Sequence, residues 1–225
     1  MWGVVLHGTP PRRGLGAWYV GRGLAWGASE TGAGSLVCER GDGMGSMKRF
    51  LRGLFTHEVE VQPRIVELEH PIRILGLAVD TNSRRVARDV ARLGGQFEKT
   101  KKEIGIPNRK EPWGFAAVSK DYDEAQGTFW YMMGDVVTSL DEVPGGLIPF
   151  EIPPGTYAVF PVRPKNRWGW AVAITGVKRY AYTAWLPGSG YEPAGTIDDF
   201  EYHDERSIRK DNPEIDLYVA IREKP

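Results

Sequence analysis

One glutamate set between aromatic residues is the strongest candidate for chemistry in this sequence. It is Glu201, in the run Asp199-Phe-Glu-Tyr-His203. On a strand, side chains alternate between the two faces, so Phe200 and Tyr202 point one way while Glu201 and His203 point the other. If the two rings pack beneath covering helices, Glu201 faces an open cleft. A carboxylate among aromatic rings is partly desolvated, which raises its pKa and strengthens pairing with a cationic or hydrogen-bonding ligand.

Aromatic side chains are the second set of candidates, because rings bind flat organic ligands and cations through contacts worth about 0.5–2 kcal/mol each. The five candidates are Trp113, Phe115, Tyr131, Tyr157 and Trp170. Tyr131 and Trp113 are the strongest candidates for lining a cleft, and Tyr157 is a weaker one. Trp170 can instead belong only to the packing face of a helix. For all five, the competing interpretation is core packing, the commoner place for an aromatic residue on a strand.

Other kinds of site lack their sequence signals. The four histidines are far apart, and neither an HExxH motif nor a Cys/His pair is present, so we expect no metal site. Cys38 is the single cysteine and cannot form an internal disulfide. Ser189 does not follow a strand, as a nucleophile elbow requires. Neither Gly21-Arg-Gly23 nor Gly41-Asp-Gly43 has the strand and helix context of a nucleotide-binding loop, so we expect no cofactor.

The charge balance limits the classes of partner. The chain has 225 residues, with 29 basic and 29 acidic side chains. This balance gives no general attraction to nucleic acid or to anionic membranes. Apolar runs are shorter than the ~20 residues that a membrane span needs, and the N-terminal apolar stretch is short for a signal peptide. We therefore expect a cytoplasmic protein without a membrane partner.

Composition changes near Met47. Residues 1–46 hold 12 of the 28 glycines and no lysine, and they show neither helical nor strand periodicity. We interpret them as a disordered tail or as sequence upstream of a start at Met47, followed by a linker at 47–57. The tail has no pair of helices that could form a helix-turn-helix, so we expect no direct DNA binding. Residues 58–225 are predicted to form one domain.

Within 58–225 the apolar pattern predicts an α+β fold built from a duplicated unit. Each unit is strand, helix, strand, strand. Expected strands are 59–68, 72–81, 113–120, 128–139, 156–162, 199–205 and 214–222, and expected helices are 83–103 and 168–186. Val86, Val90, Leu93 and Phe97 give the first helix one apolar face. Two such units would place two helices on one face of an antiparallel sheet and leave a ligand cleft on the other face.

Several strings resemble the GyrI-like family, the effector-binding domain attached to AraC- and MerR-type regulators, here without the DNA-binding domain. The strongest are residues 152–160, 185–192, 199–202 and 214–221, and residues 113–118, 121–123 and 129–139 match more loosely. The resemblance covers nearly all of residues 60–225. It implies two repeats that form a cleft, with Glu201 as the polar anchor for a ligand.

Three functions are compatible with this resemblance. The first is a stand-alone small-molecule binding protein for drugs or metabolites, with an aromatic or cationic ligand. The second is a hydrolase of cyclopropane-bearing DNA-alkylating natural products, in which Glu201 acts as general base or electrostatic stabiliser and Tyr131 orients water or substrate. The third is a protein-interaction module of the gyrase-inhibitor kind, whose cleft has no ligand. The first two use the same residues, so the sequence leaves open whether the protein is an enzyme.

Overall fold

The structure is a computed structural model that describes residues 61–165 and 169–225. The predicted tail at 1–46 and linker at 47–57 lie outside the described residues, as does the predicted start of the domain at residue 58. In the described part of the chain, no helix is long and apolar enough to span a membrane.

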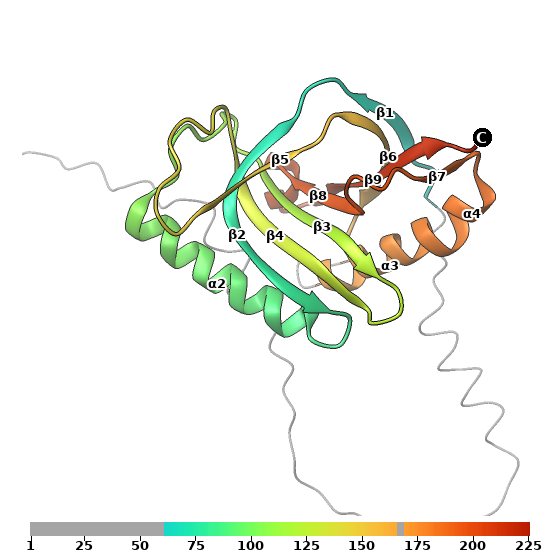
Figure 1. Cartoon of the computed structure of the whole chain (residues 1–225), viewed down its shortest axis with the longest axis horizontal. Helices are drawn as coiled ribbons and strands as arrows, with labels where there is room; N and C mark the ends of the chain where they lie inside the picture. Colours follow the sequence, from blue (N-terminus) through green and yellow to red (C-terminus); the bar gives the residue numbers. More distant parts are fainter. Residues whose placement is uncertain (1–60, 166–168) are drawn as a thin grey trace, which may run out of the picture.

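The elements follow the predicted order (Figure 1). Their bounds are β1 Arg64–Leu68, β2 Ile72–Asn82, α2 Val86–Ile104, β3 Phe115–Asp123, β4 Thr128–Val137, β5 Ile148–Ile152, β6 Gly155–Val162, α3 Trp170–Tyr180, a π-helical segment η2 Ala181–Trp185, α4 Leu186–Gly188, β7 Tyr191–Pro193, β8 Asp199–His203, a 3-10 segment η3 Glu205–Ile208 and β9 Ile215–Glu223. The sequence pattern predicted neither β5 nor β7, and it merged α3, η2 and α4 into one helix.

All pairings in the sheet are antiparallel, in the order β1-β6-β9-β8-β3-β4-β2-β5, with β7 on β9. The two predicted units are β2-α2-β3-β4 and β6-α3-β8-β9, and they meet where β3 pairs with β8. Each half also supplies an edge strand to the other: β1 precedes the first half but pairs with β6, and β5 precedes the second half but pairs with β2. The predicted α+β duplication is confirmed.

Helices α2 and α3 cover the same face of the sheet, as the strand register shows. Ala117 of β3 pairs with Glu201 of β8, and Glu201 in turn pairs with Leu217 of β9, so these side chains point to one face. Ala117 packs in a cluster with Leu93 and Phe97 of α2. Leu217 packs in a cluster with α3. Figure 1 shows both helices along one side of the curved sheet.

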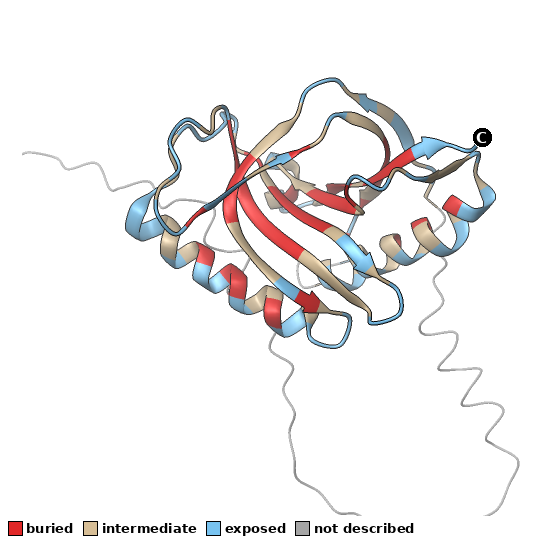
Figure 2. Cartoon of the chain, viewed as in Figure 1, coloured by how far each residue is buried: buried red, intermediate tan, exposed pale blue. Residues whose placement is uncertain are grey.

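The opposite face has a buried core of its own. Its central side chains include Ile74, Val118, Met132, Tyr157 and Phe200, and no residue of a helix belongs to this cluster in the described ranges. Val66 and Leu68 of the edge strand β1 pack against it. Buried residues concentrate on the central strands of the curved sheet (Figure 2). The helix-free face is therefore a packed interior over much of its width.

Helix α2 begins and ends where the local residues favour it. The Asn82 side chain accepts hydrogen bonds from the backbone N–H groups of Arg84 and Arg85, at 3.0 and 3.1 Å, just before the first turn. Basic residues occupy the last turn, where the helix dipole favours positive charge. Gly105 follows with φ of 73°, a conformation that costs glycine little. These features set the two ends of α2, and Leu93 and Phe97 pack its apolar face on the sheet.

Candidate functional site

A cluster of charged side chains lies on the helix-covered face, centred on Glu201. The carboxylate is 7% exposed, and its Oε1 lies 3.0 Å from Nζ of Lys178 in α3. The same ammonium lies 2.8 Å from Oδ1 of Asp199, two residues earlier on β8. We call Lys178, Asp199 and Glu201 the charge cluster. It contains two carboxylates and one ammonium, so it carries one excess negative charge.

Two polar neighbours complete the surroundings of this cluster. The Tyr182 hydroxyl, in the π-helical segment η2, lies 3.1 Å from Oδ2 of Asp199 and 3.0 Å from the Asp198 carbonyl oxygen. Nε2 of His203 lies 3.8 Å from Oε2 of Glu201, close enough to add attraction when the imidazole is protonated. Every second residue of β8 points to this face, which explains why Asp199, Glu201 and His203 lie together on it.

The placement of Glu201 corrects the sequence prediction. Phe200 and Tyr202 belong to the core on the helix-free face and do not pack beneath the helices. Glu201 therefore points toward α3. Alternation along the strand was predicted correctly, but the choice of face rested on the assumption that large rings need helical cover. The curled sheet and its edge strands bury Phe200, and no helix residue of 61–165 or 169–225 belongs to its cluster.

The predicted direction of the Glu201 pKa is also wrong. Burial does push the pKa upward, but the Lys178 ammonium and the nearby His203 outweigh it and lower the pKa from 4.5 to about 2. Burial on its own would lower the Lys178 pKa, but the carboxylates of Asp199 and Glu201 raise it above its ordinary value. Glu201 and Lys178 are therefore both charged at neutral pH.

Tyr131, Phe115 and Trp170 gather on the same face as Glu201. Burial raises the pKa of Tyr131, and the negative charge of Glu201 adds to this effect, so its hydroxyl stays protonated. The Phe115 ring lies 5.4 Å from the His203 ring, and the Trp170 ring lies 6.3 Å from it on the α3 side. Phe97 of α2 lies 6.2 Å from Phe115. A row of rings therefore runs from α2 across β3 and β8 to α3.

The other two aromatic candidates lie elsewhere. Tyr157 is 1% exposed in the core of the helix-free face, and its hydroxyl donates to the Pro153 carbonyl oxygen at 2.7 Å. Its strand presents Tyr157 to the face away from Glu201, so the two do not share a site. Its predicted role as a ligand residue stays a prediction. Trp113 is partly buried in the segment just before β3. Its predicted role stays a prediction.

Lys178 and Asp199 were missed by sequence reasoning. A lysine in the middle of a predicted amphipathic helix is usually solvent-exposed. The available signal was that Lys178 directly follows Val177 on the apolar face, four residues before Tyr182. Asp199 is the first residue of the predicted strand 199–205. Because it lies two residues before Glu201, its side chain is on the same face of that strand.

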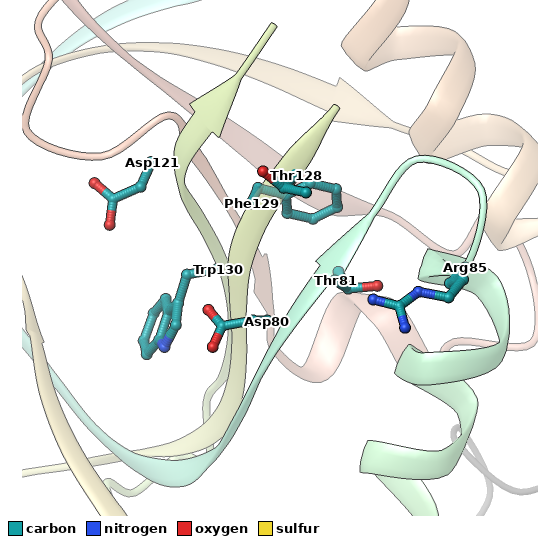
Figure 3. A pocket seen from close by; sticks show the side chains of 7 residues that line it. All are labelled: Asp80, Thr81, Arg85, Asp121, Thr128, Phe129 and Trp130. Atoms are coloured by element: carbon teal, nitrogen blue, oxygen red, sulfur yellow. The ribbon is translucent and has the colours of Figure 1, made fainter. Parts of the chain in front are cut away.

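A separate hollow lies around the ends of β2 and β4 (Figure 3). Its volume is about 350 Å³, and none of the six predicted site residues lines it. The lining residues are Asp80, Thr81, Arg85, Asp121, Thr128, Phe129 and Trp130. Lys120 already places its ammonium 5.3 Å from the centre of the Trp130 ring and pairs with Asp121. This hollow is open and has charges of both signs, unlike the buried charge cluster.

Metal binding has no support from the described side chains, among which no group of three or more His, Cys, Asp or Glu residues comes together as a ligand set. The carboxylates of the charge cluster are matched instead by an ammonium, a hydroxyl and an imidazole.

Comparison with known proteins gives one family. Residues 64–221 match the Cass2 family model, described as integron-associated effector binding protein. The transcriptional regulator BrlR of Pseudomonas aeruginosa is 33% identical over 100 residues, which cover 44% of this chain and 35% of BrlR. The chain thus matches about a third of the length of that curated relative.

Solved structures share the fold at low identity. SAV2435 bound to tetraphenylphosphonium has a TM-score of 0.55 and 10% identity, covering 71% of this chain and 93% of SAV2435. A protein from Staphylococcus aureus MU50 has a TM-score of 0.52 and 12% identity, covering 72% of this chain and 99% of that protein. EcmrR, in a complex with DNA, has a TM-score of 0.52 and 12% identity, covering 80% and 64%.

Proposed function

Because the chain belongs to the Cass2 family of integron-associated effector-binding proteins, we propose that it binds a small organic cation at the charge cluster on its helix-covered face. The observation that carries the proposal is the excess negative charge of a buried site. Two carboxylates, each less than a tenth exposed, share one ammonium. A desolvated negative charge next to apolar rings favours a cation that brings its own apolar surface.

The surrounding rings support an aromatic ligand. Phe115, His203 and Trp170 lie in sequence from β3 to α3, with ring-centre separations of 5.4 and 6.3 Å. Rings at this spacing can stack on a flat group or contact a cation with their faces. Tetraphenylphosphonium, which is bound in the structure of SAV2435, combines positive charge with aromatic surface and is a suitable probe.

Entry to the buried cluster requires movement, and the helix above it has an irregular segment. Lys178 belongs to α3 and Tyr182 to the π-helical segment η2 that follows directly. A π segment often occurs in helices at functional sites, because its hydrogen bonding departs from the regular pattern. We assign the α3–η2 segment as the part that opens when a ligand enters.

The hydrolase alternative is less well supported. A general base works best when its pKa lies near the working pH, but the pKa of Glu201 is lowered to about 2. The carboxylate in this state is a counter-ion for Lys178, which fits a binding anchor better than a proton acceptor. The interaction-module alternative predicts no saturable small-molecule binding at all.

Thermal unfolding with increasing tetraphenylphosphonium tests the proposal. We expect a saturable rise in Tm that is lost in Glu201→Gln and retained in Glu192→Gln, whose carboxylate pairs with Arg222 on the surface. Mass spectrometry of recovered ligands from a library that includes cyclopropane-bearing alkylators separates a binder from a hydrolase. Recovery of a ligand one water heavier would contradict binding without turnover. Equal Tm rises in both variants would remove Glu201 from the site.

A further inference from the structure

Lys178 is in an unusual position for a lysine on a short amphipathic helix. It follows Val177, which is 2% exposed and packs on the sheet, and its own side chain is only 23% exposed. Its ammonium lies between Asp199 and Glu201, at 2.8 and 3.0 Å. The place that a ligand cation would take beside Glu201 is therefore already held by a cation of the protein.

We infer that Lys178 is a built-in competitor that sets the charge preference of the ligand site. This inference rests on the proposed function and adds to it the residue that controls specificity. A cation that approaches Oε1 of Glu201 meets the Lys178 ammonium and is repelled unless that ammonium moves. Two positive charges that both contact Oε1 of Glu201 would be neighbours, and like charges repel each other strongly in a poorly hydrated site.

Asp199 provides the place to which Lys178 can withdraw. Its Oδ1 is the nearer of the two carboxylate contacts, and the Tyr182 hydroxyl stabilises Oδ2. When a ligand cation binds to Glu201, Lys178 keeps Asp199 as its partner, and both positive charges remain paired. Binding is thus an exchange of counter-ions at Glu201. The pair of carboxylates on one strand makes this exchange possible.

The exchange predicts opposite effects for two neighbouring substitutions. Lys178→Met removes the competitor and tightens tetraphenylphosphonium binding by about tenfold or more. Asp199→Asn removes the alternative partner, so Lys178 stays on Glu201 and binding weakens. Triphenylphosphine oxide, a neutral probe of similar aromatic character, changes its affinity much less in both variants. The affected quantity is therefore the preference for the cation over the neutral probe.

Calorimetric titration of the full chain with both probes provides the test. Because Lys178→Met leaves two carboxylates without a buried counter-ion, the double variant Lys178→Met/Asp199→Asn is measured alongside it. This variant keeps the excess charge of the cluster at one negative charge and frees Glu201, so it is also expected to bind tetraphenylphosphonium about tenfold tighter than the unaltered protein.

The outcomes separate this inference from the proposed function. Binding that disappears in Glu201→Gln but is equal or weaker in the double variant would overturn the competitor role and leave the ligand site standing. No binding of either probe to any of these proteins would overturn both. A gain that is confined to the cation and occurs in both variants lacking Lys178 would support the inference.

Discussion

Glu201 is buried as an ion, and the cost of burying it is offset by the charges around it. Its folded-state pKa of about 2 lies below the ordinary 4.5, mainly because Lys178 opposes the effect of burial. A group with a lowered pKa contributes stability above its unfolded-state pKa and loses it as pH falls toward the folded-state value. This lowering corresponds to on the order of 3 kcal/mol.

The lowered pKa of Glu201 predicts that the protein becomes less stable as the pH falls. Between pH 5 and pH 3 the unfolded carboxyl is protonated first, so the protein loses about 2 kcal/mol of stability from this group. Urea unfolding at the two pH values should show that Glu201→Gln loses about 2 kcal/mol less than the unaltered protein. Glu192→Gln is the surface control and should follow the unaltered protein. Parallel losses in all three would contradict the ionised state of Glu201.

The second prediction concerns the partner charge. Lys178→Met at neutral pH leaves two adjacent buried carboxylates without their ammonium, and we expect a loss of about 3–5 kcal/mol. Adding Asp199→Asn removes one carboxylate and should restore part of that loss. Chemical unfolding of the single and double variants measures the difference. A single variant as stable as the unaltered protein would show that Lys178 does not compensate the carboxylates.

A sequence motif pointed to Glu201, but the residues around Glu201 in the fold could not be predicted from the sequence. Alternation along β8 is a local property and was predicted correctly. The face that each set of side chains occupies depends on what covers the sheet, which is a tertiary property. Lys178 reaches Glu201 because α3 packs on β6 and β9, and β8 is the next strand beside β9. Neither helical spacing nor composition reports where on the sheet a helix packs.

Among the elements, β2 and β4 pair through two glycines that leave no room for side chains. Gly76 is directly opposite Gly134 in the register. A Cβ atom added at Gly76 would lie 1.8 Å from the Met133 carbonyl oxygen, and one at Gly134 would lie 2.5 Å from the Leu75 carbonyl oxygen. Both obstacles are backbone atoms, so neither can move without distorting the pairing of the strands.

The third prediction compares two glycines. Gly76→Ala should destabilise the protein by about 3 kcal/mol or more, because the clash is with the backbone of the neighbouring strand. Gly95→Ala is the matched control: it lies in α2 with open space around its would-be Cβ, and alanine there should stabilise the helix by about 1 kcal/mol. Thermal unfolding of the two variants measures both. A tolerated Gly76→Ala would contradict the close approach of β2 and β4.

Long elements were predictable and short ones were not. The spacing of Val86, Val90, Leu93 and Phe97 identified α2 to within a few residues of its bounds. Strands β5 and β7 have five and three residues and contain proline, so they offer too few positions to show a period. The change from α3 to the π segment η2 leaves no mark in apolar spacing at all.

Across the whole molecule, the two halves are bound together by exchanged edge strands. β1 pairs with β6 of the second half, and β5 pairs with β2 of the first. The duplication could be predicted because both halves repeat the same order of elements. The exchange could not, because sequence order alone does not say on which edge a strand will pair.

The fourth prediction tests the boundary of the folded unit. Removing residues 1–46 should leave the urea midpoint and ligand binding unchanged, since the predicted domain begins at residue 58 and the family match at 64. Removing residues 1–69 also deletes β1, exposes the edge of β6 and takes Val66 and Leu68 from the core. We expect a marked loss of stability from this second deletion alone. Equal stability of the two shortened chains would show that β1 is dispensable.

The most direct test of the account is calorimetric titration of tetraphenylphosphonium into Glu201→Gln and Trp130→Leu in parallel. The first variant alters the charge cluster, and the second alters the hollow at the ends of β2 and β4. We predict that Glu201→Gln weakens binding by about tenfold or more, while Trp130→Leu binds like the unaltered protein. Retained affinity in Glu201→Gln together with lost affinity in Trp130→Leu would contradict the account and place the ligand at the hollow.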